Sequence, residues 1–227
     1  MDYYYITYGF AFLTLIISLA ANIFVTSSYK KYSKYANKKN ITGAEAARMI
    51  LNANGLQDIY VVETKGNLTD HYDPSRKVIR LSSGVYNAES ISAVAIAAHE
   101  CGHAIQDKEA YRPMRIRSKI VPIINFSSYA GYVVLIIGII MQSLNLIWAG
   151  IILEAAILLF QLITLPVELD ASKRAMKIIQ EQNLLIDNEC GKAKTVLTAA
   201  ALTYVAAVLS AMLEILRLVI LYGSKRD

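Results

Sequence analysis

Long stretches of apolar residues are the main pattern in this sequence. Residues 4–25 form a run of about 22 uncharged residues, or about 33 Å of helix, which is enough to cross a bilayer. Residues 120–165 are too many for one crossing and are interrupted by polar residues between 142 and 145, so they predict a hairpin of two spans. Residues 196–222 form a further candidate span. The pattern therefore predicts a mainly α-helical membrane protein with about four transmembrane helices.

Basic residues flank these stretches and set the expected orientation. Asp2 is the only charged residue before the first run, whereas a signal peptide carries basic residues there. The lysine-rich segment, residues 29–39, follows the run instead. Because cytoplasmic loops carry the excess of lysine and arginine, the N-terminus is expected outside and the following loop in the cytoplasm. Residues 112–119 and 173–177, on either side of the hairpin, are also basic, while the turn near Asn145 is uncharged. We expect a multi-pass protein of the cell membrane.

Charged residues within and after the last spans have more than one interpretation. Four spans place the C-terminus outside, although Lys225 and Arg226 point the other way. Glu154, in the third span, and the pair Glu214 and Arg217, in the fourth, are unfavourable in lipid. They line a polar path for a substrate, form a packing pair, or lie at the interface, where Arg217 can extend its charged end into water.

The composition agrees with a membrane protein. The chain has 227 residues, 55% of them hydrophobic, and a formal net charge of +5 that is mostly a topology signal. Tyr29, Tyr32 and Tyr35 alternate with lysines, but directly after a span this pattern is typical of a juxtamembrane anchor. We therefore expect a lipid bilayer as a partner and no nucleic acid. Cys101 and Cys190 form no disulfide framework, and the oligomeric state is not encoded in any visible motif.

Residues 29–119 predict a compact cytoplasmic lobe of the α+β class. Thr42 and Glu45 form a capping box that opens a helix running to about residue 53. Residues 58–64 and 77–82 have the β-branched composition of strands, and Asn87 or Ser90 starts the next helix. We expect the last strand to lie along a cleft and to pair with an extended substrate.

The pentapeptide His99-Glu100-Cys101-Gly102-His103 is the clearest chemical signal. Two histidines four residues apart on a helix lie about 40° apart around its axis, so both imidazoles can reach one metal ion, with Glu100 beside it as the general base. This arrangement is typical of zinc-dependent peptidases. The alternative is a helix with two structural histidines. Cys101 lies on another face and is expected to pack in the core.

The metal motif is expected outside the bilayer. Its apolar run, residues 91–105, is about 15 residues long and is bounded by charged residues on both sides, so it is too short to span.

A catalytic zinc usually has three protein ligands and one open position, so a third ligand is needed. Gln106 and Glu109 stand where the metzincin pattern requires glycine and histidine, which excludes that class. Glu168 follows the hairpin, which returns the chain to the side that it left, and is the expected third ligand. Asp170 is the rival ligand. The remaining alternative is that both acids are only interfacial charges.

An oxyanion stabiliser is also needed. His71, Tyr111, Arg112 and Arg115 are candidates by chemistry alone, and for each a structural role is the stronger expectation. His71 lies beside a turn, where a hydrogen bond to the turn backbone is expected.

Four segments together resemble a known family. They are the first membrane span, TDHYDPSRKVIRLS (69–82), AAHECGHAIQD (97–107) and LPVELDASKRA (165–175). The combination resembles the putative neutral zinc metallopeptidase family of bacterial membrane proteins over nearly the whole chain. That family is similar to the membrane gluzincins of the heat-shock and prenyl-protein protease type. The resemblance implies a zincin-like fold, Zn²⁺ and endopeptidase activity.

The resemblance also bears on the third ligand. In those gluzincins it is the glutamate of a Glu-x-x-Ala-Asp motif. Glu168 and Ala171 fit this motif, whereas Ser172 replaces its aspartate. Asp170 is then the candidate for the residue that supports a ligand from behind.

The expected function is a membrane-embedded zinc endopeptidase, with a zincin-like lobe at the cytoplasmic face, that cleaves polypeptides, membrane proteins among them. The alternative is a non-proteolytic membrane scaffold stabilised by zinc. The expected organisation is an anchor helix (1–28), the cytoplasmic lobe (29–119), a transmembrane hairpin (120–165), a cytoplasmic segment with the third ligand (166–195), and a last span with its tail (196–227).

Overall fold

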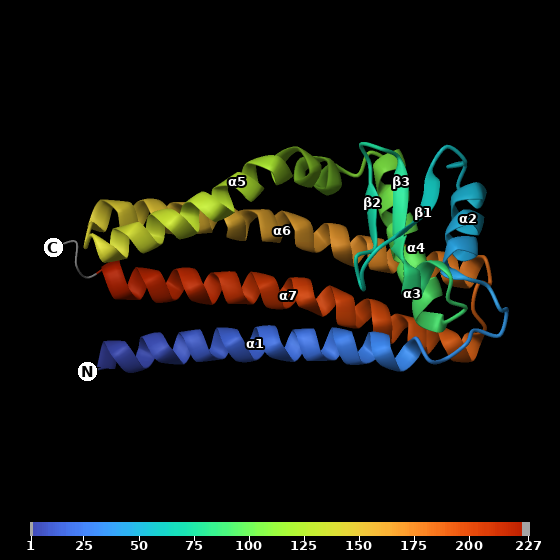
Figure 1. Cartoon of the computed structure of the whole chain (residues 1–227), viewed down its shortest axis with the longest axis horizontal. Coiled ribbons are helices and arrows are strands. Elements are labelled where there is room, and N and C mark those ends of the chain that lie inside the picture. The colour runs from blue at the N-terminus through green and yellow to red at the C-terminus, as the bar shows by residue number, and fades with distance from the viewer. Residues whose placement is uncertain (1, 224–227) are drawn as a thin grey trace. The chain divides into compact units, whose positions relative to one another are not determined.

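The computed structural model describes residues 2–223 (Figure 1), so Lys225 and Arg226 lie outside the described residues. The chain folds into two compact units. The first contains the residues up to Asn22, Arg115–Pro166 and the residues from Thr203 onward. The second contains Ile23–Met114 and Val167–Leu202. Four helices contribute residues to both units, because each of the four unit boundaries falls inside a helix.

Long apolar helices make up the first unit. Three described helices are long and apolar enough to cross a membrane: α1 (Asp2–Tyr32), α6 (Leu144–Glu181) and α7 (Asp187–Gly223). Helix α5 (Arg112–Ile140) contains Pro122 and bends by 53°, and it makes a fourth candidate if its two halves are one span. The expectation of a mainly helical chain is confirmed, and the about four membrane helices that were expected compare with three candidates, or four if the bent pair is one span.

The predicted hairpin is formed by α5 and α6. The break falls at residues 141–143, where Gln142 has a positive φ of 52° and leaves the helical path. Glycines let the two helices approach closely: a Cβ at Gly138 would lie 2.7 Å from the Ile147 nitrogen, and one at Gly150 would lie 2.8 Å from the Leu135 Cβ. Small residues at such contacts are the usual way in which membrane helices pack.

The charged residues of α7 pair with each other. The Arg217 Nε donates to Glu214 Oε2 at 2.9 Å, one helical turn away, and both side chains are partly buried. The structure therefore shows Glu214 and Arg217 as an ion pair within one helix. Elsewhere in this unit, the hydroxyls of Ser18 in α1 and Ser210 in α7 lie 3.1 Å apart.

The second unit contains a small mixed sheet and the helix with the metal motif (Figure 1). The capping box is present: the Glu45 amide donates to the Thr42 hydroxyl at 3.1 Å, and Glu45 accepts from the Thr42 amide at 2.7 Å. Ser90 caps the metal-motif helix by accepting from the Ala93 amide at 3.2 Å. The elements are α2 (Gly43–Ala53), β1 (Tyr60–Thr64), β2 (His71–Asp73), β3 (Val78–Ser82), α3 (Ser83–Tyr86) and α4 (Ile91–Lys108).

The sheet corrects one expectation about the strands. Its order is β1-β3-β2, with β3 parallel to β1 and antiparallel to β2. The short strand β2 was not predicted, because its three residues are too few for an alternating pattern and lie beside a turn. Since β3 is hydrogen-bonded on both sides, it cannot be the strand that pairs with a substrate, as the sequence had led us to expect.

The core of the second unit forms around α4. Most of this helix is buried, and its alanines let it pack closely against α2, α3 and the sheet. The same core includes Ala175 and Ile179 from the end of α6, and Leu184 and Leu185 from the turn that follows. Helix α6 therefore continues without a break from the second arm of the hairpin into this unit, and it carries Glu168 there.

The close packing of the hairpin gives a first prediction. Gly150→Val should lower the thermal unfolding midpoint in detergent, since its added atoms meet the Leu135 backbone and overpacking of this kind typically destabilises by about 1–3 kcal/mol. Gly191→Ala is the matched control: a Cβ at Gly191 meets nothing within 4 Å, so alanine should raise the midpoint or leave it unchanged. Equal midpoints for Gly150→Val and the parent would contradict the hairpin packing.

Candidate metal centre

Two helices of the second unit bring three side chains to one point. His99 and His103 lie on successive turns of α4, and Glu168 lies on α6. The Glu168 Oε2 is 3.2 Å from His99 Nε2 and 3.4 Å from His103 Nε2. One candidate ligand atom from each residue lies within 4.8 Å of the other two, so a single metal ion can be held by all three.

A glycine inside the motif makes this approach possible. A Cβ at Gly102 would lie 2.8 Å from the Ala171 carbonyl oxygen, which is closer than real Cβ contacts. Gly102 on α4 and Ala171 on α6 are both buried and mark the point where the helix backbones meet. Because Glu168 stands about one turn before Ala171, this crossing sets its carboxylate against the two histidines.

His103 is oriented by Gln106, which is fully buried. The Gln106 Nε2 donates to the Val167 carbonyl at 2.9 Å and to Asp170 Oδ2 at 2.8 Å, so its amide orientation is fixed by two acceptors. Its Oε1 then faces His103 Nδ1 at 3.0 Å and must accept a hydrogen bond from the Nδ1–H group. The assigned tautomer leaves the lone pair of His103 Nε2 free for a metal ion.

His99 has a corresponding partner on α6. Its Nδ1 lies 3.2 Å from the Ser172 hydroxyl, which can accept a hydrogen bond from Nδ1–H and so leave the Nε2 lone pair for a metal ion. Ser172 stands where the related motif has an aspartate, so the replacement keeps a hydrogen-bond acceptor but removes a negative charge.

Asp170 touches neither histidine. It accepts from Gln106 and from Arg174 Nε at 2.5 Å, while Arg174 Nη1 donates to Glu109 Oε2 at 2.6 Å. It is therefore not one of the three clustered side chains. Asp170 is linked to His103 through Gln106, which forms hydrogen bonds with both.

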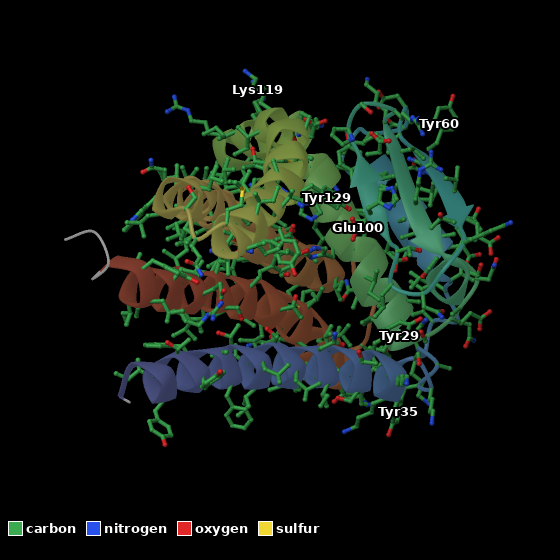
Figure 2. The ribbon with its side chains drawn as sticks, turned by 60° about the vertical axis from the view of Figure 1, so that its left-hand side comes forward. Tyr29, Tyr35, Tyr60, Glu100, Lys119 and Tyr129 are labelled. Carbon is green, nitrogen blue, oxygen red and sulfur yellow. The ribbon has the colours of Figure 1, made fainter. Side chains whose placement is uncertain are left out.

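Glu100 lies on α4 between the two histidines in sequence and is buried (Figure 2). Burial raises the pKa of its carboxyl group, although the neighbouring histidines oppose the shift. For His103, burial lowers the pKa, but the hydrogen bond to Glu168 and the nearby Glu100 charge outweigh it, so the net shift is upward. The Nε2 proton that faces Glu168 in the absence of a metal is the one that a metal ion would replace. The acids thus give this cluster a negative potential, which suits a cation.

The other sequence-based candidates are not among the three clustered side chains. The exposed ring of His71 is 2.8 Å, through Nδ1, from the Thr69 carbonyl oxygen, which is the expected contact with turn backbone. The Tyr111 ring stacks under the Arg174 guanidinium at 5.9 Å, and Arg112 is exposed. Arg115 belongs to the first unit.

Cys101 packs in the core, as expected. It is fully buried, and its thiol faces the Ala47 carbonyl at 3.6 Å.

Sequence reasoning missed the two residues that orient the histidines. Gln106 was considered only as a departure from the metzincin pattern, and Ser172 only as a lost aspartate. A signal was present for both, because Gln106 follows His103 by three residues and Ser172 follows Glu168 by four, so each shares a helix face with a clustered residue.

This donor set, two imidazoles and one carboxylate on facing helices, is that of a zinc peptidase. Comparison with known proteins agrees: the profile of the family described as "Putative neutral zinc metallopeptidase" matches residues 7–223, and the chain belongs to this family. It is 48% identical over 221 residues to "Putative membrane protease YugP" of Bacillus subtilis (strain 168), covering 96% of this chain and 98% of that protein. No solved structure matches the chain.

The contacts of Gln106 give a second prediction. Gln106→Leu removes the acceptor for His103 Nδ1 and should weaken zinc binding by about 10- to 100-fold, measured by competition with a chelator. Ser172→Ala should weaken it by a similar or smaller factor, since a hydroxyl is a weaker support. Gln180→Leu, at an exposed position of α6, is the control and should bind zinc like the parent. Parent-like affinity in folded Gln106→Leu protein would rule out the orienting role.

Proposed function

We propose that this chain is a membrane-anchored zinc endopeptidase, with His99, His103 and Glu168 as zinc ligands and Glu100 as general base. The observation that carries the proposal is the tautomer arrangement. Both Nδ1 atoms have partners, so both Nε2 atoms are available on the side where the Glu168 carboxylate lies. A pair of purely structural histidines has no need of this arrangement.

The residues fit a zinc ion in number and chemistry. Two neutral imidazoles and one carboxylate leave a fourth position open, as catalytic zinc sites require. When bound there, zinc would polarise the scissile carbonyl and lower the pKa of the attacking water towards 7.

Glu100 supplies the proton transfer in this mechanism. Its carboxylate takes the proton from the attacking water and later delivers it to the leaving amine. The burial that raises its pKa strengthens it as a base and also suits the later step, in which it must act as an acid. Gln106 and Ser172 keep the histidines in place throughout.

We further propose that the second unit is a zincin-like lobe in which β2 offers the free sheet edge to the substrate. Strand β3 is hydrogen-bonded on both sides, whereas β1 and β2 are the two edge strands, and of these β2 packs on α4. The Tyr72 hydroxyl of β2 donates to Asp107 of α4 at 2.9 Å, which ties this edge strand to the metal-motif helix. An extended peptide adding to β2 would run beside α4.

The position of Glu168 supports membrane-proximal substrates. It is the first charged residue after the uncharged stretch 155–167 of α6, so the metal site lies at the end of a candidate span. We propose that the enzyme cleaves membrane-proximal or misfolded polypeptides at the cytoplasmic face of the cell membrane. In this proposal the chain keeps the organisation expected from its sequence, with an anchor (1–28), a lobe (29–119), a hairpin (120–165), a ligand-bearing segment (166–195) and a last span (196–227).

Substitution of Glu100 separates the enzyme from a zinc-stabilised scaffold. Glu100→Gln keeps the size of the side chain and should keep zinc, whereas cleavage of a peptide library should fall by about 10²- to 10⁴-fold. His99→Ala and Glu168→Ala should lose both zinc and cleavage, because two remaining ligands hold the ion poorly. Zinc content by metal analysis and cleavage by mass spectrometry are the two readouts.

Two outcomes would count against the enzyme. Cleavage by Glu100→Gln at the parent rate would remove the proposed base. A fully metallated parent that cleaves nothing across soluble peptides and membrane proteins would leave the scaffold as the better function.

The orientation of the chain in the membrane is tested by cysteine labelling of intact cells. In a background lacking Cys101 and Cys190, a membrane-impermeant thiol reagent added to intact cells should label Asn145→Cys and should leave Lys65→Cys unlabelled until the cells are opened. Both positions are exposed or partly exposed, so access to the residue itself does not limit the reaction. Labelling of Lys65→Cys in intact cells would place the lobe on the outer side.

A further inference from the structure

Lysine and tyrosine side chains gather where α1 ends and α7 begins, within the second unit. The Lys31 ammonium lies 5.3 Å from the centre of the Tyr32 ring, and the Tyr32 and Tyr35 rings are 6.1 Å apart. The Lys192 ammonium of α7 lies 4.7 Å from the centre of the Tyr35 ring. We call these four residues the lysine–tyrosine cluster. Two segments far apart in the sequence thus form one surface.

The positive charge of this surface is not neutralised by carboxylates. Lys30, Lys34 and Lys194 flank the cluster and are exposed. Within residues 2–223, none of the cluster or flanking lysines forms an ion pair, unlike Lys77 with Asp58 or Lys177 with Glu181.

The buried acid at the start of α7, Glu189, already has hydrogen-bond partners. Glu189 accepts from the Lys38 amide at 3.0 Å and from the Ile186 amide at 3.2 Å, so both of its oxygens are used by backbone groups. Its role is to fix the loop after α1 against the start of α7, which holds the two basic segments together.

The cluster stands at the ends of two candidate membrane spans. The uncharged stretch of α1 ends at Tyr29, directly before Lys30, and the uncharged stretch of α7 begins at Thr195, directly after Lys194. Tyr35 is exposed near the end of α1 (Figure 2). Tyrosine rings and lysines at this level are the groups that meet lipid headgroups, the ring at the interface and the ammonium at the phosphate.

We propose that the lysine–tyrosine cluster is a binding surface for the phosphate groups of anionic phospholipids. Lys31 and Lys192 reach the same headgroup region from two different helices, with the two tyrosine rings between them. A bound headgroup therefore ties the end of α1 to the start of α7. The proposal is independent of proteolysis, because none of the four residues belongs to the metal centre.

Titration of the purified full chain in micelles with phosphatidylglycerol or phosphatidylcholine tests the surface, with bound lipid counted by native mass spectrometry. The parent should prefer phosphatidylglycerol, and the preference should weaken as salt is raised. The double variant Lys31→Gln/Lys192→Gln should lose about tenfold or more of the preference, since a lysine near an anionic surface contributes about a fivefold factor.

Two further double variants serve as controls for the loss of charge. Lys65→Gln/Lys77→Gln removes the same charge from the region of the sheet and should retain the parent preference. Lys31→Arg/Lys192→Arg keeps the charge and should also retain it, which separates loss of charge from loss of folding.

Several results would overturn the proposal. They are equal binding of the two lipids by the parent, an unchanged preference in the glutamine double variant, and release of phosphatidylglycerol by inorganic phosphate, which would make the ligand free phosphate. Binding of duplex DNA at physiological salt, lost in the glutamine variant and without a lipid preference, would assign the surface to nucleic acid.

Discussion

The close crossing of α4 and α6 is the constraint on which the candidate site depends. At Gly102 a helix backbone carrying two histidines meets the backbone at Ala171, with no room for a Cβ between them. This contact lets the carboxylate of Glu168, about one turn away from Ala171, reach the Nε2 atoms of both histidines. A larger residue at position 102 would move the helices apart and separate the carboxylate from the imidazoles, so the glycine of the motif has a packing role beside the chemical roles of its neighbours.

Buried hydrogen bonds convert this crossing into a defined arrangement of ligand atoms. Gln106 uses its whole amide, with two donors directed to α6 and one acceptor directed to His103. Ser172 makes the corresponding contact with His99 from the other helix. Because a buried amide or imidazole is destabilising when its hydrogen bonds are unmet, each contact also holds α4 against α6. The same interactions that stabilise the packing fix the tautomers.

The two units are linked through continuous helices. Helix α6 leaves the hairpin turn, runs through an uncharged stretch, and within one further residue carries the third clustered side chain. Helices α1 and α7 change from uncharged to lysine-bearing segments in a similar way. The boundary between apolar and charged sequence is therefore where the chemistry of this protein is concentrated, with carboxylates at the metal centre and ammonium groups at the proposed lipid surface.

Much of the architecture was determined by the sequence alone, because local patterns encode it. Apolar runs of sufficient length predicted the long helices, the Thr42 and Glu45 capping box predicted the start of α2, and the spacing of His99 and His103 predicted a shared direction on α4. Glu168 was expected from the return of the hairpin. Local patterns could not supply the partners across the helix crossing or the order of the strands. Ser172 and Gln106 acquire their roles only when α6 packs against α4, and β3 is central only because the unpredicted strand β2 pairs with it. These features depend on contacts between distant segments, which the tertiary structure alone decides.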